Sequence, residues 1–349
     1  MYGGFVGTET MRGGRNPALN ETILSGDIGI PNDNSDNSLR IVDGGAGALI
    51  DGFTIRDGNG LDGPVGTQSG TGIALAGDAT VRNCQLINNR GFGGAAIWIG
   101  GTGIVERCVF RGNVSTLGAG ALYLQKSGRV ESSLFANNRS DNGGAIFAQA
   151  GGSLVQCTIV NNHASNAGGG VWGNPQMINS ILWGNTASFG GNQISGTIAT
   201  IRCIVQGGWP GSNLTVVSPG FVSQGAGDFR LLPTSPAVDA GLATTLFATF
   251  DAAGNARLLD GNGNGQALPD IGAYEYGVPN VITGVVIGPS GKARVNFLGT
   301  TNLIYSVEAS TNLVDWEVIG SAPFSTADFI YRDDAAPGFG KRFYRTRLP

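Results

Sequence analysis

The chain of 349 residues contains 60 glycines, only 13% charged residues and a formal net charge of −4. It has no basic patch that could neutralise phosphates, which argues against nucleic acid as a partner, and no apolar run approaches the roughly 18 residues of a transmembrane helix. Glycine at about two and a half times its usual frequency, without a Gly-X-Y period, indicates many tight corners in one long domain, with room for a second small one.

The first 70 residues carry a short strand at 22–24 and two polar excursions, at 31–38 and 57–70. Such excursions leave a solenoid on one face, and here they would flank one mouth of a groove. Met1 opens directly onto Tyr2-Gly3-Gly4-Phe5, without the basic, apolar and small-residue pattern of a signal peptide. We therefore expect that the N-terminal part of the protein, including its leader, is missing from this sequence.

From residue 71 to about 205, three independent columns repeat with a period of 23 to 25 residues. A cysteine or serine returns at Cys84, Cys108, Ser133, Cys157, Ser180 and Cys203. An asparagine returns at Asn89, Asn113, Asn138, Asn162 and Asn185. An aliphatic residue follows a glycine-rich corner at Ile97, Leu122, Ile146, Val171 and Ile194. Self-similarity at a fixed period is the signature of a repeat protein.

Each repeat holds two or three short apolar runs separated by Gly, Asn and Ser, and no repeat has room for an amphipathic helix. Leucine-rich repeats have a similar length but need a denser leucine pattern. The pattern predicts an all-β fold, a right-handed parallel β-helix of the pectate-lyase-like kind, with three strands per coil and about 4.8 Å between coils.

In such a coil, residues that repeat once per turn stack on their equivalents. The column Val81, Val105, Val130, Leu154 and Met177 should point inward. The asparagines suit bends, because Asn tolerates the left-handed conformation and stacked amides can hydrogen-bond. The four cysteines are expected to stay reduced, because parallel in-register side chains lack the torsion of a disulfide.

Two sets of motifs resemble known families. FxxN at 110–113 and 135–138, with GGAI at 143–146, resembles the repeats of chlamydial polymorphic outer-membrane proteins. YGGFVGTET at 2–10, SPAVDAG at 235–241 and DIGAYE at 270–275 resemble the choice-of-anchor Q proteins. That resemblance covers about residues 1–276 and implies a secreted or cell-surface bacterial β-helix. The family has no agreed catalytic residues, so none is carried over.

The period breaks at Gly207, which divides the chain into expected parts. Residues 1–227 should form the coils, and 228–277 should carry the choice-of-anchor Q motif and cover the open edge of the last coil. Residues 281–349 alternate apolar and polar positions and predict a small β-sandwich with Trp316 at its centre. Trp316 and the strand-like end at 342–345 resemble C-terminal modules of secreted planctomycete and verrucomicrobial proteins.

The run DGNGNG at 260–265 is the best metal candidate, with alternating oxygen side chains as in the first half of a calcium loop. The predicted ligands are Asp260, Asn262 and Asn264, with Asp270 (or Glu275) in place of the missing Glu of an EF-hand. Asp-Gly and Asn-Gly pairs are also ordinary turn formers, so a plain turn is the alternative.

Catalysis would need clustered carboxylates, and the acids of the coils are scattered. Only Glu106 and Glu131 share a column, with Arg82, and a solvated face is the expected explanation. His163 follows a column asparagine where other coils have arginine, which indicates a tolerant surface position. No catalytic residue is assigned, although an active site built from the loops at 31–38 and 57–70 remains an alternative.

Four aromatic residues lie near one column and can either bind sugar rings or merely stabilise the coil, namely Trp98, Tyr123, Phe147 and Trp172. Two functions therefore remain open. The first is a non-catalytic, adhesin-like scaffold, secreted or on the cell surface, which is monomeric and binds a polysaccharide or another cell-envelope component. The second is a lyase or glycoside hydrolase acting on an acidic polysaccharide in a lateral groove.

Overall fold

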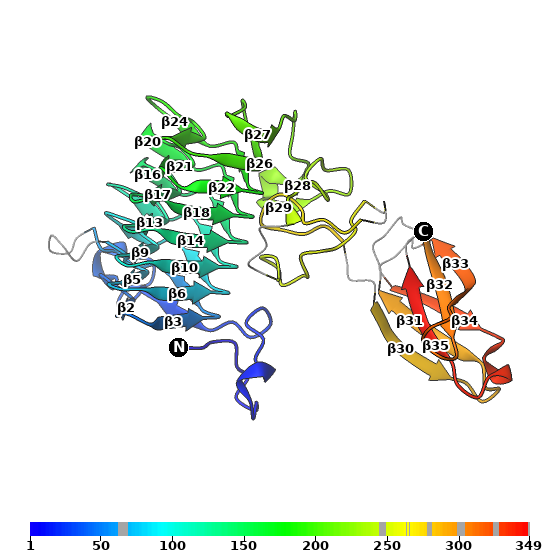
Figure 1. The fold of residues 1–349 in the computed structure, drawn as a ribbon. Helices are drawn as coiled ribbons and strands as arrows, with labels where there is room; N and C mark the ends of the chain where they lie inside the picture. The colour runs from blue at the N-terminus through cyan, green and yellow to red at the C-terminus, as the bar shows by residue number, and fades with distance from the viewer. Residues whose placement is uncertain are drawn as a thin grey trace.

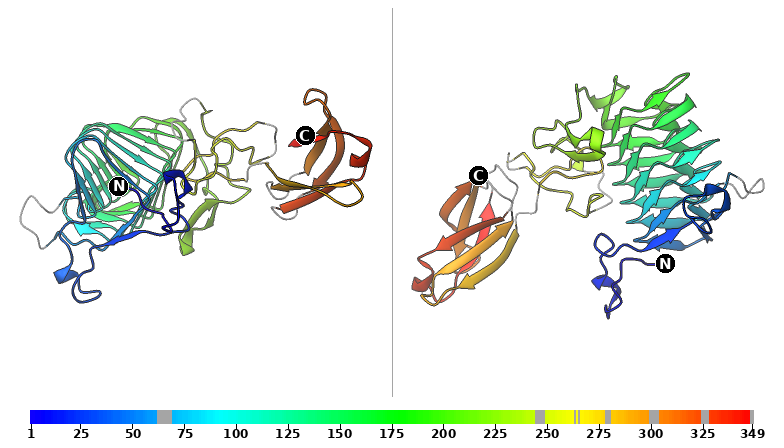
Figure 2. Two further views of the ribbon diagram at one scale, coloured as in Figure 1. Left: turned by 90° about the horizontal axis from the view of Figure 1, so that it is seen from below. Right: turned by 180° about the vertical axis from the view of Figure 1, so that it is seen from behind.

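The structure is a computed structural model that describes residues 1–61, 69–243, 249–262, 264, 266–277, 281–298, 304–323 and 328–347. Short parallel strands up to about residue 214 wind into stacked coils, seen from three sides in Figures 1 and 2. A small hairpin and two small antiparallel sheets follow. The predicted all-β parallel β-helix is therefore confirmed. No helix in the described part of the chain is long and apolar enough to cross a membrane.

Each regular coil passes through four strands, which stack into four ladders. The first ladder contains β3 (Ala48–Asp51), β6 (Ala79–Arg82), β10 (Gly103–Glu106), β14 (Gly128–Glu131), β18 (Gly152–Val155), β22 (Gln176–Ile178) and β26 (Thr200–Val205). The second contains β1 (Ile23–Ser25), β4 (Thr54–Arg56), β7 (Gln85–Ile87), β11 (Val109–Arg111), β15 (Leu134–Ala136), β19 (Thr158–Val160) and β23 (Ile181–Trp183), and it ends on β26.

The other two ladders complete the coil. The third contains β8 (Arg90–Gly91), β12 (Val114–Ser115), β16 (Arg139–Asn142), β20 (His163–Ala167) and β24 (Thr186–Ala187). The fourth contains β2 (Val42–Gly44), β5 (Ile73–Leu75), β9 (Ile97–Ile99), β13 (Leu122–Leu124), β17 (Ile146–Ala148), β21 (Val171–Gly173) and β25 (Ile194–Ser195). Two 3-10 turns, η1 (Arg12–Gly14) and η2 (Asn34–Asp36), lie on the N-terminal excursions.

Four strands per coil differ from the three that the sequence predicts. A residue with left-handed φ separates the first and second ladders in coil after coil, at Asn83, Arg107, Ser132, Gln156, Asn179 and Arg202. A second left-handed column separates the second and third ladders, at Asp57, Asn88, Gly112, Asn137, Asn161 and Gly184. The bend is thus made by the residue before the column asparagine, and not by the asparagine itself as expected. Asn and Gly are frequent there because they adopt this conformation at the least cost.

The predicted asparagine column is confirmed as a continuous hydrogen-bonded stack in the interior. The side-chain oxygen of Asn138 accepts from the backbone N–H of Asn113 at 3.0 Å and from its amide nitrogen at 2.9 Å. The amide nitrogen of Asn138 donates to the Phe110 carbonyl at 3.2 Å. The same arrangement repeats at neighbouring coils, where Asn89 and Asn162 are fully buried. Each amide thereby satisfies backbone groups that the corner would otherwise leave unpaired.

The core is continuous along the axis. Val105 pairs in register with Val81 and Val130, and the inward column that they define is fully buried. Phe110 and Phe135 stack with their ring centroids 4.4 Å apart. All four cysteines are buried free thiols, as expected. The far end of the coils is closed by β27 (Gly211–Leu214), which pairs with β26, and by Trp209, which packs on the core.

The described residues of 221–277, which we call the lateral segment, do not cover the open end of the last coil as expected. They lie along the outer face of the second ladder, and Figure 1 shows them beside the coils. The segment starts with β28 (Phe221–Ser223), the turn η3 (Gln224–Ala226) and β29 (Asp228–Leu231). Its apolar side chains, such as Phe229 and Ile271, bury the outward side chains of Leu134 and Ile181. The backbone N–H of Ala273 also donates to Thr158 Oγ1 at 2.8 Å.

The C-terminal strands form two three-stranded antiparallel sheets. The first is β30 (Val281–Ile287), β31 (Ala293–Leu298) and β34 (Asp328–Asp333). The second is β33 (Glu317–Pro323), β32 (Ile304–Ser310) and β35 (Phe343–Arg347), and the turn η5 (Ala336–Gly338) joins β34 to β35. Val295, Phe297 and Val307 are their shared core. Trp316 is not at the centre but half-buried, with the Arg345 guanidinium 4.2 Å from its ring centroid.

Candidate functional site

The four predicted aromatic residues form one column on the outer face of the fourth ladder. Tyr123 is in register with Trp98 on one side and with Phe147 on the other, and Phe147 is in register with Trp172. All four are half-buried, whereas the residues flanking Tyr123 on β13 are fully buried. Alternation along the strand therefore turns the rings outward, and the column extends over about 14 Å at about 4.8 Å per coil.

The rings of this aromatic column are held in fixed positions. Tyr123 meets Phe147 edge-on with centroids 4.8 Å apart, and Phe147 lies 4.2 Å from Trp172. The Trp98 indole instead lies over Gly100, where a Cβ would come within 2.6 Å of the ring. The Tyr123 hydroxyl donates to Gln149 Oε1 at 2.6 Å, and burial raises the pKa of this tyrosine. Apolar faces with amide groups at their edge match the two sides of a sugar ring.

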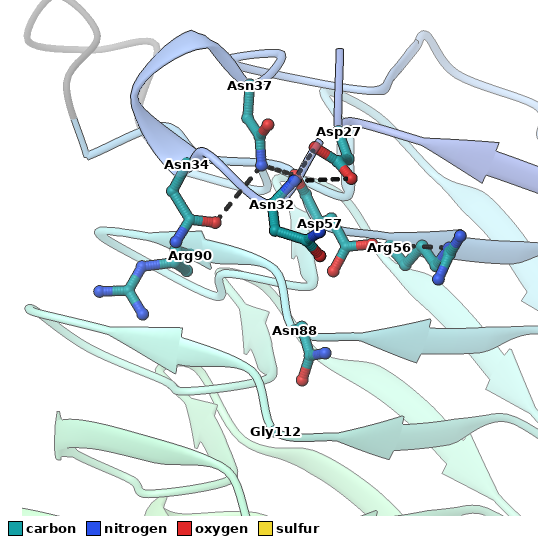
Figure 3. A pocket seen from close by; sticks show the side chains of 9 residues that line it. All are labelled: Asp27, Asn32, Asn34, Asn37, Arg56, Asp57, Asn88, Arg90 and Gly112. Atoms are coloured by element: carbon teal, nitrogen blue, oxygen red, sulfur yellow. Dashed lines mark hydrogen bonds and ion pairs between the residues drawn. The ribbon is translucent and has the colours of Figure 1, made fainter. Parts of the chain in front are cut away.

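The loops at 31–38 and 57–70 contribute to a separate site, which we call the loop pocket and which is shown in Figure 3. Its volume is about 480 Å³. The lining residues are carboxylates, guanidinium groups and amides, with one glycine: Asp27, Asn32, Asn34, Asn37, Arg56, Asp57, Asn88, Arg90 and Gly112. Residues 62–68 of the second loop lie outside the described residues. The sequence indicated both loops, but the contribution of the left-handed corner residues could only be seen in three dimensions.

Asp57 is the most unusual group in the loop pocket. Its φ is +63°, a strained conformation for a residue other than glycine. Burial raises the pKa of Asp57 despite the neighbouring positive charge of Arg56, whose Nε lies 3.5 Å away, and the negative charge of Asp27 raises it further. In Figure 3 Asp57 lies between Arg56 and Arg90. Two carboxyl groups in different environments thus face one cavity. In such an arrangement one group can act as a general acid and the other as a general base.

The described side-chain oxygens of the predicted calcium loop accept hydrogen bonds from backbone N–H groups of the same stretch. Asp260 Oδ1 and Asn262 Oδ1 both accept from the backbone N–H of Asn264, and Asn264 Oδ1 accepts from that of Gln266. Asp270 is fully buried, with its carboxylate bonded to the N–H groups of Asp239 and Tyr276. The described residues contain no group of three or more His, Cys, Asp or Glu side chains placed to hold a metal ion. Calcium binding by this loop stays a prediction.

Asp270 belongs instead to a buried ionic cluster that joins the lateral segment to the coils. Arg257 and Glu275, whose side chains are 1% and 0% exposed, form an ion pair at 3.4 Å. Arg257 also donates to Ser132 Oγ at 3.0 Å, and Glu275 accepts from the N–H of Asp270 at 3.0 Å. Burial raises the pKa of Asp270 to about 7 and that of Glu275 to about 9. The DIGAYE motif therefore supplies two buried carboxyl groups where the lateral segment packs on the coils.

The column of Arg82, Glu106 and Glu131 is not a solvated face, contrary to expectation. Glu131 is only 2% exposed, is paired with Arg129, and has its pKa raised by burial to about 7. The same column starts at Asp51, which is fully buried. Burial opposes the ionisation of Asp51, yet hydrogen bonds from Arg15, Asn83 and Arg82 hold its pKa below the ordinary value. Sequence reasoning missed Asp51, because it lies 31 residues before Arg82 and so falls outside the period of 23 to 25 residues.

His163 occupies the predicted tolerant position. Its column on the third ladder runs through Arg90, Val114, Arg139, His163 and Thr186. The imidazole Nδ1 lies 2.9 Å from Thr186 Oγ1. The side chains of this column differ in size and charge from coil to coil, and the tolerant surface position stays a prediction.

The coils define the class of protein, a parallel β-helix. A model of the family described as right handed beta helix region matches residues 22–194, which extends from β1 to β25. This part of the chain is therefore a right-handed β-helix region. No curated protein and no solved structure gives a significant match to the chain.

Proposed function

We propose that the protein is a non-catalytic β-helix that binds carbohydrate on its aromatic column, as a monomer that is secreted or displayed on the cell surface. The observation that carries the proposal is the contact of Tyr123, Phe147 and Trp172 on three successive coils, with half-exposed rings. Rigid exposed aromatic residues bind at a small entropic cost. The resemblance of 2–10, 235–241 and 270–275 to choice-of-anchor Q proteins, and of the FxxN and GGAI repeats to outer-membrane protein repeats, supports the location.

Replacing the ring at the end of the stack tests this function. Trp172→Ala should weaken glycan binding at least tenfold, because a tryptophan anchor contributes more than about 1.4 kcal/mol when it is covered by a ligand. The measurement is a glycan-array screen followed by titration calorimetry with the best glycan. Phe189→Ala is the control, since Phe189 is 86% exposed and lies on the loop after β24, outside the strands of the fourth ladder. Equal binding by the wild type and Trp172→Ala would exclude the aromatic column.

A second candidate function is glycoside hydrolysis in the loop pocket, favoured by the raised pKa of Asp57 and the nearby carboxylate of Asp27. Hydrolases of this kind use one carboxylic acid and one carboxylate. Against it stands the number of carboxylates among the described lining residues. There are two, whereas an acidic-polysaccharide enzyme of this shape needs a cluster of three or more together with a basic residue.

Asp57→Asn should reduce polysaccharide cleavage at least a hundredfold if Asp57 is the proton donor. Asparagine tolerates the left-handed conformation, so the backbone at this corner is preserved. Asp43→Asn is the matched control, with a side chain that is 70% exposed. Reducing-sugar release across a polysaccharide panel is the readout. A wild-type protein that cleaves nothing, or an Asp57→Asn protein that cleaves normally, would remove hydrolysis from consideration.

A further inference from the structure

A groove of about 780 Å³ lies on the outer face of the second ladder, between the N-terminal excursion and the lateral segment. We call it the arginine groove. Its floor comes from β7 and β11 through the outward side chains of Gln85, Val109 and Arg111. One wall is the stretch 12–18 around η1, and the other contains residues 252–254 and Tyr274. Three parts of the chain that are distant in sequence thus enclose one site.

The charge of this groove is opposite to that of the whole chain. Four arginines line it, Arg12, Arg15, Arg107 and Arg111, and none of the described lining residues is Asp or Glu. The chain as a whole has a net charge of −4. Two of the arginines form ion pairs with acidic residues that do not line the groove. Arg15 pairs with the fully buried Asp51 at 2.5 Å, and Arg107 pairs with Glu106.

The other two arginines are positioned by neutral groups. Arg12 donates to the Tyr2 hydroxyl at 2.8 Å and lies 4.8 Å from the centre of its ring. Arg111 donates to the Gly227 carbonyl at 3.1 Å and lies 5.8 Å from the Phe229 ring centroid. Neither forms an ion pair with any described residue. Asp228 forms its ion pair with Arg230, which lowers the pKa of that carboxyl, and Arg111 lies near enough to lower it further. Guanidinium groups that are held in place without a direct ion pair are prepared to bind a carboxylate or sulfate in bidentate fashion.

Between the arginines, Asn16, Asn83, Gln85 and Tyr274 line the groove with groups that bind hydroxyls. We propose that the arginine groove binds an acidic polysaccharide, whose carboxylates or sulfates contact Arg12 and Arg111 while its hydroxyls contact the amides. A nucleic acid fits less well, because its closely spaced phosphates require many more cations than this acidic chain presents. The proposal goes beyond the aromatic column, which lies on another ladder and needs no charge.

The test uses the full chain in titration calorimetry with oligogalacturonate, heparin oligosaccharide and a neutral glucan, at 50 and 200 mM salt. At least one of the two acidic ligands should bind, more weakly at high salt, and which one binds distinguishes carboxylate from sulfate recognition. R12Q/R111Q should reduce that affinity at least tenfold, and R12Q alone should reduce it in part. Arg12 is exposed, so its single variant keeps the fold.

R139Q is the matched control, because Arg139 is an exposed arginine on β16, outside the groove. It should bind as the wild type does, and so should Trp172→Ala, which separates this site from the aromatic column. The proposal is overturned if neither acidic ligand binds, or if R12Q/R111Q retains full affinity. Equal binding of a short DNA duplex, with the same loss in R139Q, would indicate non-specific polyanion attraction and would also overturn it.

Discussion

Asn138→Ala is expected to lower the free energy of unfolding by about 3–5 kcal/mol, a large fraction of the stability of an ordinary domain. The substitution leaves the buried N–H and amide groups of Asn113 without their acceptor and removes the side-chain donor to the Phe110 carbonyl. Each buried polar group that loses its partner costs about 1–3 kcal/mol. The measurement is chemical denaturation followed by circular dichroism.

The control for this variant is Asn166→Ala. Asn166 is exposed on β20, and its amide donates only to the side chain of Asn142 at 2.8 Å. Its replacement should change stability by no more than about 0.5 kcal/mol. Equal effects of the two substitutions would mean that the asparagine column contributes nothing beyond local side-chain contacts.

The second large effect concerns pH. The pKa values of Glu131 and Asp270 are raised to about 7 and that of Glu275 to about 9 by burial, against ordinary values near 4. The folded state therefore holds more protons than the unfolded state between about pH 4.5 and 9, and stability must fall as pH rises through this range. A tenfold difference in proton affinity between the two states corresponds to about 1.4 kcal/mol, so the melting temperature should be several degrees lower at pH 9 than at pH 5.

Glu131→Gln tests this assignment, because glutamine resembles the protonated acid. The variant should melt at a higher temperature than the wild type at pH 9 and at nearly the same temperature at pH 5. Glu317→Gln, at a side chain that is 64% exposed, should leave the whole profile unchanged. A wild-type melting temperature that rises from pH 5 to pH 9 would contradict the raised pKa values.

The coil register was predictable because a period of 23 to 25 residues places equivalent side chains on top of one another. The aromatic column, the inward column and the asparagine column all follow from that single regularity. The fourth strand of each coil was not predictable, since no single residue type marks its corner, which is made by Asn83, Arg107, Ser132 and Gln156 in successive coils. Only their common backbone conformation defines the column.

The lateral segment escaped prediction for a different reason. Its contacts join residues that are more than 100 positions apart, such as Arg257 with Ser132 and Ala273 with Thr158. Nothing in its sequence repeats, so no periodic signal points to its partner. Glu131 likewise is an acidic residue of the kind expected at a surface, and its burial could not be read from the sequence. The arginine groove depends on the same long-range placement and could not be anticipated either.

The position of the lateral segment also determines the order in which the molecule can be completed. A ribosome synthesises the coils first, and each new coil can add its strands to the one before it. The outward side chains of Leu134, Val160 and Ile181 nevertheless stay exposed to solvent until residues 229–273 have been synthesised. The last folding step is therefore the packing of the lateral segment onto coils that folded earlier. Until that moment, the growing protein carries an apolar stripe along its flank.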